Sequence, residues 1–408
     1  MSQAAPRSRG SAGDRTGPLR DVRILDCTQA LAGPYCTMLL ADLGADVVKI
    51  EPPRGDMARV LGPRPEDAEG CDYGGYFASI NRNKRSIALD LKEPADRDVF
   101  LRLVESADAV VENARVGVMD RLGVGYETLR DRNPRLVYVA IRGFGDPRTG
   151  ESPYADWPAF DIVAQSMGGM VGLTGPRGSA GMPAGASVGD LFPGTLAALG
   201  LVSALLSSRA TGRGQFVDVA MYDAVLSLCE NIVYKYSASG HVERPKGEGH
   251  PSLCPFDVYE TADGAVALAA PVEPQWQALC DAMQRSELGT DERTKNVFAR
   301  VANRDFTNAA ILAWTRGRTT SAVVKALAGR VPVGPVQSAE DIFRDPHARV
   351  REMLVEVESP GANAPLTLAG APIKLTETPS GVYRRPPLVG EHTIEVLAEA
   401  GIEREESR

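Results

Sequence analysis

Metal-ligating side chains are scarce in this chain, and none of them forms a metal-binding motif. The 408 residues include four histidines and six cysteines, and no two cysteines stand in a CxxC pair. Structural zinc sites need closely spaced ligands, and disulfide scaffolds need more cysteines in a much shorter chain. We therefore expect no bound metal, no tightly bound cofactor, no disulfide framework and a reducing, cytoplasmic location.

Long apolar runs and an excess of positive charge are also missing. The most apolar stretch, 191–206, is interrupted by proline, glycine, threonine and serine, which predicts a buried helix rather than a membrane span. Acidic residues outnumber Lys and Arg by 53 to 45, and the net charge of −8 argues against a nucleic-acid partner. Residues 1–20 carry arginines without an apolar core, so we expect a flexible tail rather than a signal peptide.

Strand-like and helix-like segments alternate through the first 150 residues. Predicted strands at 22–26 and 45–51 flank a predicted helix at 34–43, which Pro34 opens and Gly44 closes. Crossovers of this length join parallel strands, so we expect an α/β fold with an open, doubly wound sheet. No glycine-rich dinucleotide or phosphate motif follows the first strand. Further strands are predicted at 86–91, 109–112 and 136–141, and helices at 94–106 and within 118–130.

The second half of the chain is mostly helical at first and then mixed. A strand at 216–220 is predicted between helices at 191–209 and 221–236, and the glycine-bearing stretch 241–251 is a candidate loop. Residues 252–335 are expected to form a compact α+β segment that opens with a hairpin, 256–259 paired with 265–268. The segment 331–336 is predicted to be a linker.

Two aspartates, Asp190 and Asp161, are candidates for chemistry. Asp190 is predicted at a strand end, flanked by glycines that admit a substrate closely, where it could act as a carboxylate nucleophile or base. Both aspartates precede apolar helical segments, so each could instead cap the free N–H groups of a helix. The sequence does not set the distance between them, and a carboxylate pair and two separate caps are both open.

Cationic residues recur after three of the predicted strands, at the sheet edge where open α/β folds bind ligands, and three more stand just before the strand at 86–91. They suit a phosphate-bearing ligand, while a solvated surface is the alternative for any one of them. The loop 246–250 adds Gly247 and Gly249, whose N–H groups could face an oxyanion, with a plain linker as the alternative. The cations are Arg54, Arg59, Arg82, Lys84, Arg85, Lys92, Arg115 and Arg121.

An ordered series of short motifs runs along nearly the whole chain. It comprises Leu-Ala-Gly-Pro at 31–34, Leu-Ala-Asp-Leu-Gly-Ala-Asp-Val-Val-Lys-Ile-Glu at 40–51, Asn-Arg-Asn-Lys-Arg-Ser-Ile at 81–87, Val-Glu-Asn at 111–113, Gly-Asp at 189–190, Thr-Gly-Arg-Gly-Gln at 211–215 and Gly-Glu-His-Thr at 390–393. In these motifs, residues 20–400 resemble the class III CoA-transferase family, which includes formyl-CoA transferase, carnitine-pathway CoA-transferases and α-methylacyl-CoA racemase.

The resemblance implies a fold. Such proteins have a Rossmann-like large domain built from both chain ends, a small α+β domain, and two subunits that interlock as a homodimer. The expected organisation is therefore a tail at 1–20, the large CoA-binding domain at 21–225, the small domain with its linkers at 226–335, and a C-terminal part completing the large domain at 336–408.

The resemblance also implies transfer of CoA, a substrate here, from an acyl-CoA to a carboxylic acid. An aspartate in the position of Asp190 attacks the thioester, giving a mixed anhydride and then an aspartyl-CoA thioester. Burial removes the hydration shell that weakens such a nucleophile, and Asp161, Gly247 and Gly249 are candidates to assist. By position, the CoA contacts fall on Ala30, Leu31, Arg54, Leu89, Lys92, Asn113 and Arg121.

Two other activities are weighed against transfer. The racemases of the family move protons with a histidine just before the aspartate that matches Asp161, and Phe160 stands there instead, so transfer is favoured. A catalytically silent CoA-ester-binding protein is the third reading, and the retention of Asp190 with its glycine neighbours speaks against it. The donor and the acceptor acid are not readable from the sequence.

Overall fold

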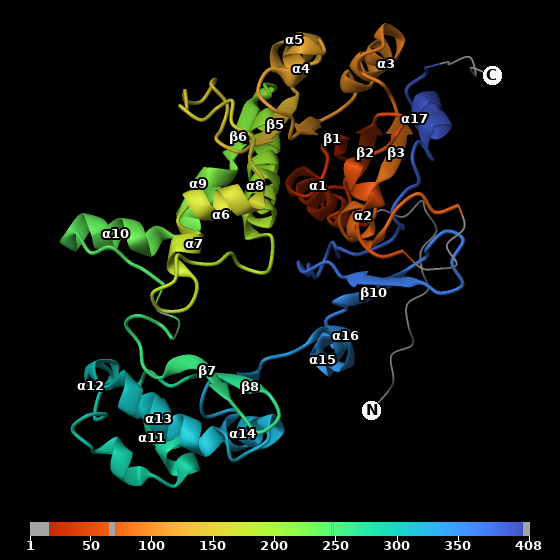
Figure 1. The fold of residues 1–408 in the computed structure, drawn as a ribbon. Helices are drawn as coiled ribbons and strands as arrows, with labels where there is room; N and C mark the ends of the chain where they lie inside the picture. Colours follow the sequence, from red (N-terminus) through yellow and green to blue (C-terminus); the bar gives the residue numbers. More distant parts are fainter. Residues whose placement is uncertain (1–15, 65–69, 246, 248, 403–408) are drawn as a thin grey trace. The chain divides into compact units, whose positions relative to one another are not determined.

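The computed structural model describes residues 16–64, 70–245, 247 and 249–402, which divide into two compact units (Figure 1). The first unit contains 184–239 together with the chain up to 170 and from 346 onward, so both chain ends build it. The second unit contains 171–183 and 240–345. The sequence placed the small domain at 226–335, but the chain stays with the first unit to residue 239, and 171–183 joins the second.

A six-stranded parallel sheet in the order β3-β2-β1-β4-β5-β6 forms the centre of the first unit, which confirms the α/β fold. Every residue of β2 and β5 is buried, as expected for parallel strands covered on both faces. The strand order reverses between β1 and β4, and the carboxyl ends of the strands at such a switch point form a ligand crevice. The strands are β1 (Arg23–Cys27), β2 (Asp46–Glu51), β3 (Arg85–Ala88), β4 (Ala109–Glu112), β5 (Val137–Arg142) and β6 (Phe216–Ala220).

Helices cover both faces of this sheet (Figure 1). Alternate strand residues such as Leu25, Val110 and Tyr138 pack with residues of α3, α5 and α17, while α1 and the long α8 pack against each other and against other strand residues. The helices of this unit are α1 (Ala32–Asp42), η1 (Met57–Val60), α2 (Gly75–Asn81), α3 (Pro94–Val104), α4 (Val118–Arg121), α5 (Tyr126–Arg132), α6 (Asp161–Met167), α8 (Val188–Thr211), α9 (Met221–Leu228), α10 (Glu230–Ser239), α16 (Pro346–Val350) and α17 (Thr393–Glu399).

Two predicted helices are interrupted in the structure. The helix expected within 118–130 is divided into α4 and α5 because Gly123 takes a left-handed φ of 73°. The helix expected at 221–236 is divided at Cys229 into α9 and α10. α8 is, among the described residues, the one helix long and apolar enough to cross a membrane by length and composition, which is weak evidence because a core helix passes the same test.

The second unit is built on an antiparallel sheet in the order β7-β8-β9. The predicted hairpin is confirmed as β7 (Phe256–Glu260) and β8 (Ala265–Ala269), but the predicted linker at 331–336 contains β9 (Val333–Pro335), which pairs with β8. Trp276, Ile311 and Trp314 lie in its core. Its helices are α11 (Glu273–Met283), η2 (Ser286–Gly289), α12 (Val297–Ala302), α13 (Arg304–Thr315), α14 (Thr320–Leu327) and α15 (Ala339–Arg344), and α7 (Met170–Leu173) begins where the chain leaves the first unit.

The C-terminal segment closes the β3 edge of the first unit. After the hairpin β10 (Leu354–Val357) and β11 (Leu366–Ala369), the His392 N–H donates to the Ser86 carbonyl at 2.9 Å, and α17 packs on β3. At the other chain end, Leu19 N–H donates to the Leu43 carbonyl at 3.0 Å, while residues 1–15 of the predicted tail lie outside the described residues.

Candidate active site

Asp190 lies in the first turn of α8 and not at a strand end, as the sequence had suggested. The helix begins there because the Ser187 carbonyl accepts from the N–H groups of Asp190 and Leu191, at 3.1 and 2.9 Å. With the residues that the structure describes, the Asp190 side chain makes no hydrogen bond or ion pair, so it does not cap the helix. Its carboxylate is therefore available for chemistry.

Asp161, in contrast, is fully engaged. Its Oδ1 accepts from the Gly189 N–H at 2.7 Å, and Gln165 Nε2 donates to Oδ1 and Oδ2 at 3.0 and 2.9 Å. Gln165 is completely buried, and its own Oε1 accepts from the Ala184 N–H at 2.8 Å. Asp161 is thus a cap, as one reading of the sequence proposed, but it caps α8 from the start of α6.

The contact between α6 and α8 brings the two carboxylates together. A Cβ on Gly189 would stand 2.6 Å from the Asp161 carbonyl oxygen and 2.9 Å from its Oδ1, so only glycine fits there. Burial, and second the negative charge of Asp161, raise the pKa of Asp190 from 3.8 to about 7. Asp190 is therefore a basic, poorly hydrated carboxylate that is partly ionised near neutral pH.

The first turns of α8 lie against the segment that follows β1. Leu191 packs on the cluster formed by Leu31, Met38 and Ile80. A Cβ on Gly194 would stand 2.5 Å from the Ala32 carbonyl oxygen, which shows how closely α8 approaches the start of α1. The aspartates therefore lie beside the β1–α1 loop, at the switch point of the sheet.

The predicted CoA contacts occupy three different environments. Ala30, Leu31 and Asn113 come together at the switch point, where Asn113 binds the backbone of the β1–α1 loop. The side chain of Leu89 is 1% exposed and packs in the core, so it is not placed to line a ligand surface. Three cations are exposed on the loops after β2 and β3 and on α4 after β4: Arg54, Lys92 and Arg121.

The predicted cationic cluster divides into buried ion pairs and exposed residues. Four cations are at most 3% exposed, and each is paired with an acid: Arg59 with Glu51, Arg82 with Asp42, Lys84 with Asp26, and Arg85 with Asp46. These four side chains are held in buried ion pairs and do not face a ligand. The other four cations are exposed and can bind an anionic group: Arg54, Lys92, Arg115 and Arg121.

Gly247 and Gly249 belong to the second unit, whereas both aspartates belong to the first. Both glycines take left-handed φ angles, 75° and 61°, and a Cβ on Gly249 would stand 2.6 Å from Nη1 of Arg304. Lys246 and Glu248 of the same loop lie outside the described residues.

Tyr76 on α2 is a site residue that the sequence did not reveal. It packs against the cluster containing Leu31, beside Leu191. Burial raises its pKa, and so do the charges of Asp190, Asp56 and Asp161, which places the phenol within the field of both site carboxylates. The signal in the sequence was the Gly74–Gly75 pair just before it, which lets α2 begin close to its neighbours.

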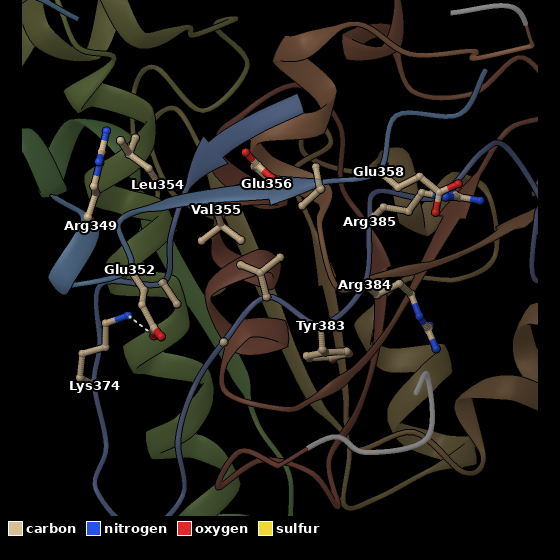
Figure 2. Close-up of a pocket in the computed structure, with 14 residues that line it drawn as sticks. Arg349, Glu352, Leu354, Val355, Glu356, Glu358, Lys374, Tyr383, Arg384 and Arg385 are labelled. Carbon is tan, nitrogen blue, oxygen red and sulfur yellow. Dashed lines mark ion pairs between the residues drawn. The ribbon is translucent and has the colours of Figure 1, made fainter. Parts of the chain in front are cut away.

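A separate pocket of about 820 Å³ lies in the C-terminal part of the first unit (Figure 2). It is lined by both cations and acids, with Lys374 3.8 Å from Glu352, and Arg385 and Glu358 at its other end. Neither aspartate lines it, and neither do the predicted CoA contacts. This pocket is therefore separate from the two aspartates at the start of α6 and α8.

Comparison with known proteins gives a consistent result over nearly the whole chain. The model of CoA-transferase family III matches residues 19–393. The chain is 49% identical over 387 residues to a succinyl-CoA:mesaconate CoA-transferase of Haloarcula marismortui, covering 95% of this chain and 97% of that protein. It is 36% identical over 401 residues to a succinate–glutarate CoA-transferase of Agrobacterium fabrum, covering 95% and 96%. The crystal structure of a CAIB/BAIF family protein from Brucella suis is similar, with a TM-score of 0.84 and 33% identity over 94% of this chain and all of that one.

Proposed function

Because this chain belongs to CoA-transferase family III and is a CoA-transferase, we propose that it moves CoA from succinyl-CoA to a short dicarboxylic acid of the mesaconate type. The relative that is 49% identical carries both substrates in its name. Succinate or succinyl-CoA also stands in the names of relatives that pair it with glutarate, D-citramalate and L-malate. Succinate or succinyl-CoA is therefore common to these four names, and their second acid is always a small dicarboxylate, whereas two other relatives are named for acetyl-CoA or formyl-CoA with oxalate.

The contrast between the two aspartates supports Asp190 as the nucleophile. Both carboxylate oxygens of Asp161 accept hydrogen bonds, from Gly189 and Gln165, whereas the Asp190 side chain makes no hydrogen bond with the described residues. Desolvation makes the Asp190 carboxylate more nucleophilic, and covalent catalysis then divides one difficult step into easier ones. Asp161 holds the first turn of α8 in place and keeps the pKa of Asp190 high.

The proposed reaction has four steps. An oxygen of Asp190 attacks the succinyl thioester carbonyl, the C–S bond breaks, and a succinyl–aspartyl anhydride and CoA thiolate form. The thiolate attacks the aspartyl carbonyl and releases succinate, leaving an aspartyl-CoA thioester. The acceptor carboxylate displaces the thiolate to form a second anhydride, and the thiolate then attacks the acceptor's carbonyl. The acceptor leaves as its CoA ester, and Asp190 returns to a carboxylate without net proton transfer.

Epimerisation fits these residues less well. A racemase needs two groups that exchange protons on opposite faces of the substrate. Phe160, directly before Asp161, cannot exchange a proton, and Asp161 is bound on both oxygens. A protein that only binds CoA esters does not need a reactive carboxylate, so the desolvated Asp190, which has no partner among the described residues, speaks against that function.

We further propose that the enzyme works as an interlocked homodimer in the cytoplasm. Large apolar side chains on α8 and α10 are more than half exposed in the single chain, and a second copy would cover them. They are Leu199, Leu206, Val233, Tyr234 and Tyr236. The six free thiols suit a reducing compartment, and light scattering on the purified protein tests the dimer.

The decisive experiment combines product analysis with trapping of the nucleophile. The enzyme is incubated with succinyl-CoA and a panel containing mesaconate, glutarate, malate and oxalate, and CoA esters are followed by mass spectrometry. With succinyl-CoA and hydroxylamine alone, Asp190 should become the hydroxamate. Asp190→Ala should abolish transfer and trapping, while Asp156→Ala, an exposed control, should keep both. Transfer that survives in Asp190→Ala would refute the mechanism, and a wild type inactive on every acid would refute the substrate class.

A further inference from the structure

The loop between β1 and α1 is held by side chains from β2 and from the segments that follow β2 and β4. Three consecutive residues, Thr28, Gln29 and Ala30, have backbone groups bound in this way. Lys49 Nζ, from β2, donates to the Thr28 carbonyl at 2.8 Å. Three of the four residues between β1 and α1 are thus held by side chains that lie far from them in the sequence.

Asn113 holds Gln29 on both sides of its backbone. Its Oδ1 accepts from the Gln29 N–H at 2.9 Å, and its Nδ2 donates to the Gln29 carbonyl at 2.8 Å. Asn113 directly follows β4, and β4 pairs with β1, so this side chain continues the pairing of the two strands past their ends. The two bonds therefore bridge the switch point itself.

Ala30 shows why the loop needs such support. Its φ of 66° lies in the left-handed region, which a residue with a Cβ adopts only when its surroundings impose it. Its N–H donates to Asp56 Oδ1 at 3.2 Å, and buried Asp56 is in turn paired with Lys49 Nζ at 2.9 Å. The conformation at Ala30 thus depends on bonds at this residue and at its neighbour Gln29.

We propose that Asn113 is a positioning residue, which sets the β1–α1 loop in the shape that receives the CoA thioester. This inference rests on the proposed function. Its effect reaches the nucleophile because Leu31, at the end of the loop, packs with Leu191, the residue after Asp190. Loss of the Asn113 bonds would let the loop relax from the left-handed turn at Ala30 and would shift the surface opposite the nucleophile.

The test compares two asparagines that each tie down a loop. Asn133 donates to the carbonyls of Val104 and Ala107 at 3.0 and 2.9 Å, but it precedes β5 and so lies at the opposite edge of the sheet. Asn133→Ala should lower the melting temperature and leave the KM for succinyl-CoA unchanged. Asn113→Ala should raise that KM about tenfold, with a smaller change in kcat.

Hydrogen exchange gives a readout that does not depend on activity. The Gln29 amide is protected by Asn113, so the peptide covering 28–32 should exchange faster in Asn113→Ala and at the wild-type rate in Asn133→Ala. Asn113→Asp keeps an acceptor for the Gln29 N–H but loses the donor, so its KM should lie between those of wild type and Asn113→Ala. The Asp variant replaces Asn113→Ala in these measurements if the Ala variant does not fold. An unchanged KM would overturn the proposal, and so would a raised KM with unchanged exchange at 28–32, which is the result expected if Asn113 only contacts CoA directly. A wild type that transfers no CoA would instead refute the proposed function, and the exchange data would still test the loop.

Discussion

The charge of Asp161 offers a direct test of the site, through the substitution Asp161→Asn. The amide is the same size, and its oxygen can still accept from the Gly189 N–H and from Gln165 as Oδ1 does now. The helix cap therefore survives, while the negative charge that helps to raise the pKa of Asp190 is removed. Burial, the larger cause, stays in place, so the pKa should fall from about 7 without returning to 3.8.

The size of the effect follows from the ionised fraction of Asp190. With a pKa of about 7, only about one molecule in a hundred carries the carboxylate at pH 5. Each unit by which the pKa falls raises that fraction about tenfold. At pH 8 the group is already ionised in the wild type, so the substitution should give no gain there, and the less basic nucleophile should be equal or slower.

The assay is the pH dependence of kcat/KM for succinyl-CoA, which reports the ionisations of the free enzyme. We expect the acidic limb of the profile to move to lower pH in Asp161→Asn and to stay in place in Asp156→Asn, an exposed control. A limb that stays where it is, in a variant that retains its melting temperature, would show that Asp161 does not act on the reacting group. A limb displaced to higher pH would contradict the sign of the interaction.

Two further predictions concern stability. Asp190 holds its proton up to about pH 7 in the folded protein and only to about 3.8 when unfolded, so wild type loses stability as pH rises between these values. Asn has no carboxylate to ionise, so Asp190→Asn avoids this loss, which is up to about 4 kcal/mol. The melting temperature of the variant should therefore be higher than that of wild type at pH 8 but not at pH 3. Equal melting temperatures at pH 8 would count against a buried carboxylate. Gly189→Ala should destabilise the protein by about 1–3 kcal/mol in thermal unfolding and lower kcat, because its Cβ would press on Asp161. Gly185→Ala, where a Cβ would meet nothing within 4 Å, should be neutral, and equal effects of the two would refute the packing argument.

The parallel sheet could be predicted because its information is local. Short apolar segments separated by helical ones give the strands within one to three residues: 109–112 is reproduced as β4, whereas the strand predicted at 86–91 ends at residue 88. Asp190 could be singled out by its glycine neighbour, since Gly189 permits the close approach of α6. The resemblance to a family then supplied the chemistry.

Contacts between distant segments could not be predicted. Lys84 looked like a ligand-binding cation, but it pairs with Asp26, 58 residues away, and only the folded sheet brings them together. Asp161 looked like a cap of its own helix, but it caps α8, which begins 27 residues later. The short strand β9 was hidden because Val-Gly-Pro has no strand pattern, and its partner β8 supplies the hydrogen bonds.

Because the C-terminal segment covers the β3 edge, the sheet is not completed until late in the synthesis of the chain. Arg85 emerges from the ribosome 310 residues before Glu395, one of its acidic partners, which at common rates of synthesis is a wait of about 15 to 60 s. During that time β3 lies at the border of the nascent sheet without α17 to cover it, and of the described acids that pair with Arg85 only Asp46 has been made. The segment that contains α17 thus completes a sheet that begins near residue 23, so a chain truncated before residue 393 would leave β3 without this cover.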